Sequence, residues 1–172
     1  NKDSLERVLV KNPMIKSAQV YYSLDGYIHV NIQQREPVLR VLTGEGYYVD
    51  RDGRVMPLSS KFTSRVVVAT GDINKKFACE KLGPFAMKLK NEPFWDAYIE
   101  QLVVRSNEDV VMIPKVGDFR IVLGKVDDCD ARLEKLILFR IFRSAILKHF
   151  QIQMNLKYLS LIQQERIIMN II

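Results

Sequence analysis

A proline interrupts the clearest alternating pattern in the chain and limits where strands can begin and end. Apolar and polar side chains alternate over residues 27–33, and Pro37 follows directly after Arg35-Glu36. Because proline cannot donate to a β-ladder, no long central strand should run through it. Gly44-Glu45-Gly46 and the Asp-Arg-Asp-Gly of residues 50–53 then separate three short apolar runs. Turn residues between such runs predict hairpins.

The segment 33–60 is therefore expected to be the seam between two modules. The first is a small α/β module of residues 1–36, and the second is a larger, β-rich module of residues 37–172. The fold class that follows is α+β, with a mixed or antiparallel β domain and two flanking helices. A chain of 172 residues, 48% hydrophobic and 27% charged, is long enough for two small folded domains.

The bulk charge and the cysteines select no particular chemistry. A net charge of +6 suits an acidic partner, an anionic membrane or nucleic acid. Cys79 and Cys129 form no metal or redox pattern, and two buried thiols are expected rather than a disulfide. The chain shows no signal peptide and no transmembrane span, and it begins at Asn1 rather than Met. We expect that a targeting or anchoring segment lies upstream.

The N-terminal module is expected to be helical first and then a hairpin. Asp3-Ser4-Leu5-Glu6 resembles a capping box with Asp3 as the N-cap, and Asn12-Pro13 should end that helix. Met14-Ile15 can begin a second short turn. The expected hairpin has strands at Gln19–Ser23 and Tyr27–Gln33, a turn at Asp25-Gly26, and a buried face of Ile28, Val30 and Ile32.

The larger module is expected to hold further strands and two helices. The strands are predicted at Val38–Leu42, Tyr47–Val49, Arg54–Leu58, Arg65–Ala69, Tyr98–Arg105, Val110–Ile113 and Phe119–Leu123. The helices are predicted at Phe77–Lys90, regular from Pro84, and at Asp127–Lys148. The core positions of the first helix are predicted to be Phe77, Leu82, Phe85, Ala86 and Leu89. Residues 152–158 alternate as a strand, and residues 161–172 fit either a strand or a short helix.

No group of residues predicts catalysis or a cofactor. The only two histidines, His29 and His149, lie beside no Cys, Ser or carboxylate pattern that would make a triad or a zinc site. Asp50-x-Asp52-Gly53 lacks the further ligands of a calcium loop and is interpreted as a turn. The arginines between residues 35 and 65 do not interleave with aromatic residues, which disfavours nucleic-acid binding. An interaction module is the default interpretation, and a hydrolase with an unseen site is the alternative.

Several motifs follow one another along the two modules. In the first module they are Ser4–Pro13 with Met14-Ile15, the AQVYY of residues 18–22, and Arg35-Glu36-Pro37. In the second they are residues 47–55 (YYVDxxGxV), Leu123-Gly124-Lys125 and Asn155-Leu156-Lys157-Tyr158. Their order resembles the extracytoplasmic part of FtsQ/DivIB-type bacterial cell-division proteins, a POTRA domain followed by a β domain. Arg35-Glu36-Pro37 looks like that family's ERxP junction, and the last motif resembles its "DLRY" strand. The segments NPMIK (residues 12–16) and YYVDRDG (residues 47–53) suggest the Bacteroidetes branch of the family.

The resemblance implies a non-enzymatic divisome scaffold, anchored in the inner membrane by one upstream helix and working in the periplasm. It would recruit an FtsB/FtsL-like pair, with no cofactor, small-molecule substrate or nucleic acid. In the family a partner strand adds to the sheet edge near the end of the β domain. Carried over, the partner-binding residues are Lys125, Lys157, Tyr158, Ser160 and Ile162. The lysines would pair with acidic partner residues and Tyr158 would pack on an apolar side chain; the alternatives are solvated lysines and an ordinary cross-strand tyrosine.

The chain departs from the family pattern in two places. A POTRA domain opens with a strand before its first helix, whereas this chain begins at the helix, so that strand is either upstream of Asn1 or absent. The Leu-Ser-Leu-Ile of residues 159–162 lacks the family's polar turn. A competing interpretation is a POTRA-containing, chaperone-like module of outer-membrane assembly or secretion.

Overall fold

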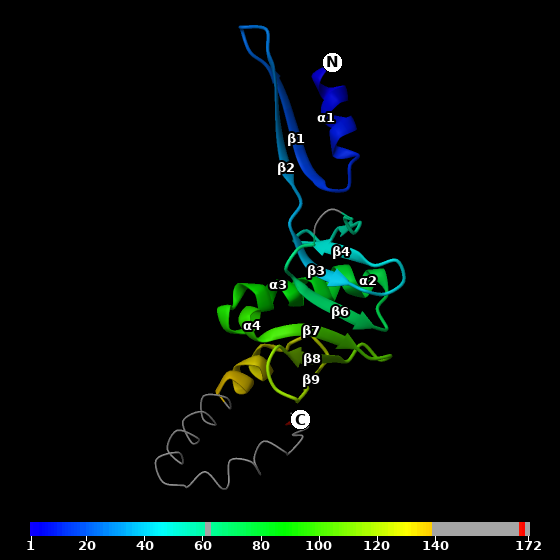
Figure 1. Cartoon of the computed structure of the whole chain (residues 1–172), viewed down its shortest axis with the longest axis vertical. Coiled ribbons are helices and arrows are strands. Elements are labelled where there is room, and N and C mark those ends of the chain that lie inside the picture. Colours follow the sequence, from blue (N-terminus) through cyan, green and yellow to red (C-terminus); the bar gives the residue numbers. More distant parts are fainter. Residues whose placement is uncertain (61–62, 139–168, 171–172) are drawn as a thin grey trace.

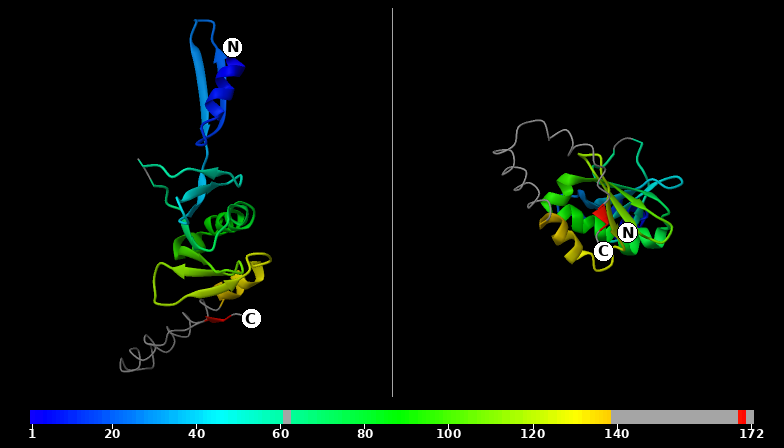
Figure 2. Two further views of the ribbon diagram at one scale, coloured as in Figure 1. Left: turned by 90° about the vertical axis from the view of Figure 1, so that its right-hand side faces the viewer. Right: turned by 90° about the horizontal axis from the view of Figure 1, so that it is seen from below.

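The computed structural model describes residues 1–60, 63–138 and 169–170. The strands in these residues form two sheets, a two-stranded hairpin and an eight-stranded mixed sheet. The hairpin and the first helix project from one end of the larger sheet, and helices cover one face of that sheet (Figures 1 and 2). The α+β fold class predicted from the sequence is confirmed.

Helix α1 (Lys2–Val10) begins two residues earlier than the capping box predicts. Asn1 is the N-cap, and its side-chain oxygen accepts a hydrogen bond from the backbone N–H of Asp3 at 3.2 Å. The predicted cap at Asp3 is wrong, because Glu6 does not reach back along the helix. Its carboxylate instead accepts from the backbone N–H of Val20 at 2.8 Å and so ties the helix to the next strand.

The hairpin starts earlier than predicted and leaves one row of apolar side chains uncovered. Strand β1 (Ile15–Tyr22) begins where a second helical turn was expected, because the backbone N–H of Ile15 bonds back to Asn12 and closes a turn. Strand β2 (Ile28–Gln34) pairs with it antiparallel. The predicted buried face of β2 is wrong: Ile28, Val30 and Ile32 are 54%, 45% and 47% exposed. They lie opposite Tyr22, Val20 and Ala18, and α1 contacts mainly the β1 side of this face.

The larger sheet has the strand order β10-β9-β8-β7-β6-β3-β4-β5. Its strands are β3 (Pro37–Val41), β4 (Tyr47–Asp50), β5 (Val55–Met56), β6 (Val67–Gly71), β7 (Ile99–Val104), β8 (Val110–Pro114), β9 (Ile121–Gly124) and β10 (Met169–Asn170). Strands β3, β6 and β7 are parallel neighbours in its centre, and the hairpin pairs β3–β4, β4–β5, β7–β8 and β8–β9 flank them. As Pro37 predicts, β2 ends before it and β3 begins at it.

The crossover from β6 to β7 is divided into several short helical segments, whereas the sequence predicts a single amphipathic helix. Three segments follow one another, α2 (Lys75–Phe77), the π-helical turn η1 (Ala78–Leu82) and α3 (Gly83–Asn91). A further helix, α4 (Pro93–Tyr98), was not predicted and starts at a proline that suits a first turn. The five predicted core positions are buried in one cluster with the inner faces of β3, β6 and β7, which confirms that part of the prediction.

The predicted long helix is described only in part. Residues 130–138 are helical, and Leu133 and Leu136 are buried against the larger sheet. The rest of the predicted helix, the strand predicted over residues 152–158 and most of the tail lie outside the described residues.

Candidate interaction surface

The β9 end of the larger sheet has a short outermost strand. Strand β10 pairs parallel with β9 through only two residue pairs, Met169 with Ile121 and Asn170 with Val122. Among the described residues, nothing pairs with Leu123 or Gly124 on that side of the sheet. Apart from the Leu123 carbonyl, which accepts a hydrogen bond from Arg132, main-chain groups at the end of β9 are therefore placed where an added strand could bond to them.

The turn that follows β9 is held by an arginine that the sequence pattern does not single out. The guanidinium of Arg132 donates to the carbonyl oxygens of Leu123 at 2.7 Å and Asp127 at 2.9 Å, and also to that of Lys125. One side chain from the helix at 130–138 thus fixes the Leu-Gly-Lys turn. No known sequence motif links an arginine at this spacing to a Leu-Gly-Lys turn, so the role of Arg132 is visible only in the folded structure.

Of the predicted partner-binding residues, Lys125 alone lies in the described part of the chain. Its side chain is 51% exposed, and its Nζ lies 3.7 Å from an oxygen of Asp109 in the turn between β7 and β8. An exposed pair at this distance contributes little to stability, so the Lys125 ammonium is available to a partner. Lys157, Tyr158, Ser160 and Ile162 lie outside the described residues.

The face of the larger sheet opposite the helices carries a groove of about 810 Å³ over β7, β8 and β9. Its lining includes the apolar side chains of Val103, Val111 and Val122 and the charged side chains of Arg105 and Arg120. A groove that combines apolar and charged side chains can accept the side chains of another protein, since protein interfaces join an apolar centre to polar surroundings.

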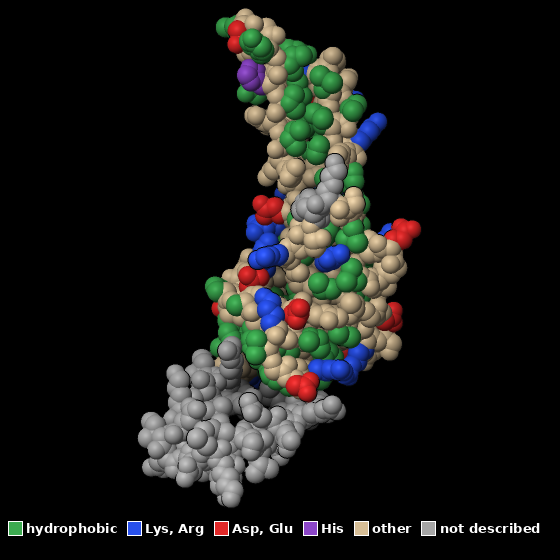
Figure 3. Space-filling view, in the orientation of Figure 1, with side chains coloured by type: hydrophobic (Ala, Val, Ile, Leu, Met, Phe, Trp, Pro, Cys, Tyr) green, Lys and Arg blue, Asp and Glu red, His purple; other side chains and the backbone are tan. Residues whose placement is uncertain are grey.

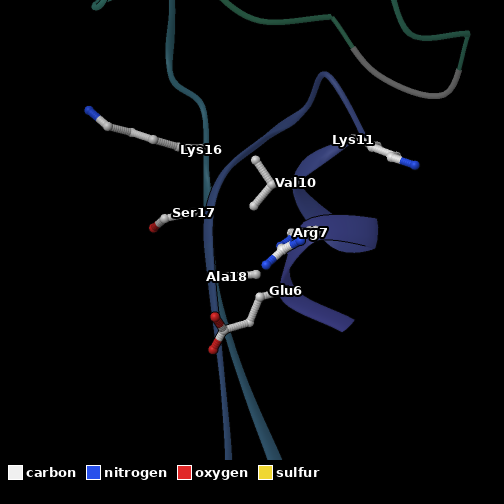
Figure 4. Close-up of a pocket in the computed structure, with 7 residues that line it drawn as sticks. All are labelled: Glu6, Arg7, Val10, Lys11, Lys16, Ser17 and Ala18. Atoms are coloured by element: carbon white, nitrogen blue, oxygen red, sulfur yellow. The ribbon is translucent and has the colours of Figure 1, made fainter. Parts of the chain in front are cut away.

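The hairpin module presents much apolar surface to solvent. Large hydrophobic side chains exposed here include Val8, Tyr22, Leu24, Tyr27 and Ile28. Figure 3 shows hydrophobic side chains as a green band over this module. A shallow hollow of about 440 Å³ lies between α1 and β1. In Figure 4, Val10 reaches into it from the helix, whereas Lys16 and Ser17 point away on the far side of β1.

The groups that could carry chemistry are dispersed. The ring of His29 stacks on Tyr21 with centroids 4.9 Å apart, and its Nε2 is 3.1 Å from the Ser23 hydroxyl. His149 is outside the described residues. Both cysteines are free thiols, and burial raises the pKa of Cys79 and of Cys129, which disfavours their thiolate forms. The searched part of the chain contains no group of three or more His, Cys, Asp or Glu residues placed to hold a metal.

The Asp50-Arg51-Asp52-Gly53 segment is a turn, as the sequence predicts. One oxygen of Asp50 accepts from the backbone N–H groups of Asp52 at 2.9 Å and Arg54 at 2.7 Å. Its other oxygen accepts from Arg35 at 2.8 Å. Both carboxylate oxygens therefore have protein donors.

Sheet edges, an open sheet face and an apolar hairpin are surfaces through which a protein binds other proteins. A family model described as "FtsQ/DivIB, C-terminal related" matches residues 36–162, and the chain belongs to this family. FtsQ/DivIB proteins are non-enzymatic, membrane-anchored cell-division proteins with periplasmic domains, so the family indicates a scaffold role in division. No curated protein matches the chain. The Bacteroidetes branch stays a prediction.

The search for membrane-spanning helices covers only the described residues. Within them, no helix has the length and apolar content that crossing a bilayer requires.

Proposed function

We propose that this chain is the periplasmic part of a divisome scaffold that recruits an FtsB/FtsL-like pair by β-augmentation. Family membership supports the division role, and the β9 end of the larger sheet supports the mode of binding. On the side of β9 that faces away from β8, the two-residue β10 is the only strand among the described residues. A partner strand would gain affinity from main-chain hydrogen bonds and its register from flanking side chains.

The proposed partner site includes Lys125 on the turn after β9 and the Lys157-Tyr158 pair, with Ser160 and Ile162 beyond it. Arg132 supports the site indirectly, because it holds the carbonyl of Lys125 and thereby the direction of that turn. Lys125 and Lys157 would meet acidic partner side chains at the rim of the interface. Charges at such positions affect association rate and partner choice more than total affinity.

The substitution Lys157→Glu tests the site. It should weaken binding of an FtsB/FtsL-like partner by at least about tenfold, because like charges then face each other. As a surface change it should leave the free energy of unfolding within about 0.5 kcal/mol. Titration calorimetry measures the first quantity and urea unfolding the second. Lys76→Glu, an exposed lysine of α2, is the matched control. Equal partner affinity in both variants would remove Lys157 from the site.

We also propose that residues 1–36 and 37–172 are separate modules and that a strand preceding Asn1 completes the first. The free edge of β2 supports this proposal. Among the described residues β1 is its only partner, and β2 carries no Asp, Glu, Lys or Arg. Natural sheets normally protect such an edge with charge or cover it. A preceding strand would cover it and would lie beside Ile28, Val30 and Ile32.

Hydrogen exchange tests this completion. In a chain extended upstream of Asn1, the outward-facing amides of β2 should exchange at least about tenfold more slowly than in the 172-residue chain, because they gain hydrogen-bond partners. The amides of the central strand β6 should exchange at the same rate in both and provide the control. Unchanged exchange in β2 would contradict the proposed strand.

A further inference from the structure

The hairpin and the larger sheet meet at one short connection, Arg35-Glu36, between the end of β2 and the start of β3. Arg35 makes contacts in both directions. Its backbone N–H donates to the carbonyl of Met14, which lies just before β1, at 2.9 Å. Its guanidinium donates to Asp50 at the end of β4, at 2.8 Å. A single residue therefore bridges the two sheets.

Asp50 is a fixed acceptor rather than a mobile surface carboxylate. Its side chain is 2% exposed and that of Arg35 is 18% exposed. The carboxylate accepts hydrogen bonds from two backbone N–H groups of its own turn, and these bonds prevent it from rotating. The direction of the Arg35 guanidinium is consequently set by the larger sheet, while the backbone of Arg35 is set by the hairpin.

Two further ion pairs surround this bridge. Lys16 of β1 pairs with Asp52 of the β4–β5 turn at 2.8 Å, and Asp52 is also 3.8 Å from Arg35. Arg51 pairs with Glu36 at 3.2 Å, and its backbone N–H donates to the Glu36 carbonyl. The hydrogen bond from Lys16 lowers the pKa of Asp52, which keeps that carboxylate ionised. Together with the Arg35–Asp50 bridge, these pairs hold the connection and the start of β1 against the turn that follows β4.

Within the described part of the chain, the ion pairs away from the connection do not join the hairpin module to the larger sheet. Lys81 and Asp127 lie 2.7 Å apart with side chains 41% and 57% exposed. They do not bridge the hairpin and the larger sheet, and such pairs contribute little. Two modules joined by a short connection and a small interface are expected to move relative to each other. What opposes that motion here is the charged cluster of Lys16, Arg35, Glu36, Asp50, Arg51 and Asp52.

We propose that this cluster is an ionic lock that holds the hairpin and the larger sheet at one fixed angle, and that removing the Arg35 charge converts the connection into a hinge. The lock goes beyond the proposed function, because it would hold whichever partner the sheet edge binds. Its role would be to keep the direction of the N-terminal module constant relative to the β9 end of the sheet.

Spin-label distance measurements test the lock. Labels are placed at Leu24→Cys in the hairpin tip and Val116→Cys in the β8–β9 turn, which are 110% and 75% exposed. Cys79→Ser removes the half-buried thiol, and Cys129 is fully buried. The labelled chain should give one narrow distance distribution. Arg35→Met should broaden it at least about twofold, because the remaining interface is small.

The matched control is Lys81→Met, which breaks an ion pair away from the connection and should leave the width unchanged. Fluorescence of buried Trp95 reports that the larger sheet is folded in every variant. If Arg35→Met does not fold, Lys16→Met serves as the test instead, because it breaks the exposed Lys16–Asp52 pair of the same cluster. It should broaden the distance distribution to a smaller extent. An unchanged width in a folded Arg35→Met chain, or in Lys16→Met where Arg35→Met fails to fold, overturns the lock. Partner binding is measured separately, so this failure is distinct from failure of the proposed function.

Discussion

Replacing Asp50 with alanine should lower the free energy of unfolding by about 3 to 5 kcal/mol, the range for breaking a buried ion pair from one side. Three groups lose their acceptor together: the Arg35 guanidinium and the backbone N–H groups of Asp52 and Arg54. Arg35 is only 18% exposed, and the carboxylate that remains near it, Asp52 at 3.8 Å, is too distant for a hydrogen bond, so the Arg35 charge loses its direct acceptor. Urea unfolding followed by circular dichroism measures the change.

Asp52→Ala is the matched control for Asp50→Ala. Asp52 lies two residues further along the same turn, but its side chain is 43% exposed. When it is removed, water can take the place of its carboxylate beside the Lys16 ammonium. The control should lose no more than about 1 kcal/mol, as exposed pairs do. If both variants lost the same free energy of unfolding, the burial of Asp50 would contribute nothing to stability. The Arg35–Asp50 bridge could then not be what holds the connection.

Replacing Gly71 with alanine should destabilise the fold by roughly 3 kcal/mol, through backbone strain and a steric clash together. Gly71 ends β6 with φ +105°, where side chains are rarely tolerated. An added Cβ would lie 2.1 Å from the carbonyl oxygen of Val104, its partner across the parallel β6–β7 pair. That oxygen is a backbone atom at the end of β7 and accepts a hydrogen bond from the Asp72 N–H, so it cannot move aside without disturbing the β6–β7 pair.

Gly44→Ala separates the clash from the strain. Gly44 also has positive φ, at +64°, but a Cβ there would meet nothing within 4 Å. Its loss should therefore be about 1 kcal/mol, the strain contribution alone. Thermal unfolding of both variants measures the difference. A Gly71→Ala chain no less stable than Gly44→Ala would show that the β6–β7 pair is looser than the structure has it.

Much of the fold could be predicted because it depends on local chemistry. Pro37 could not continue a strand, and β2 and β3 separate there. Burial of Phe77, Leu82 and Leu89 follows from their helical spacing, although the π-helical turn between them does not. That turn adds a residue without a signature. Gly83 follows it, and an added Cβ there would be only 3.1 Å from Val49 of the sheet.

What could not be predicted depends on contacts that are distant in sequence. Ile28, Val30 and Ile32 alternate as a buried face should, but burial needs an element to cover them, and alternation alone does not say whether one is present. The Arg35–Asp50 bridge joins the connection after the hairpin to the end of β4, and no spacing rule predicts it. For the candidate site, the family motif led to Lys125, whereas the role of Arg132 required the fold.

The entry of β2 into β3 affects how the molecule bears mechanical load. Strand β3 lies inside the larger sheet, bonded to antiparallel β4 on one side and parallel β6 on the other. Ladder hydrogen bonds lie across the strands, so tension arriving along β2 would act on both ladders in shear and be shared among many bonds at once. Traction applied at the N-terminal end would thus reach the whole sheet instead of peeling away a single outer strand.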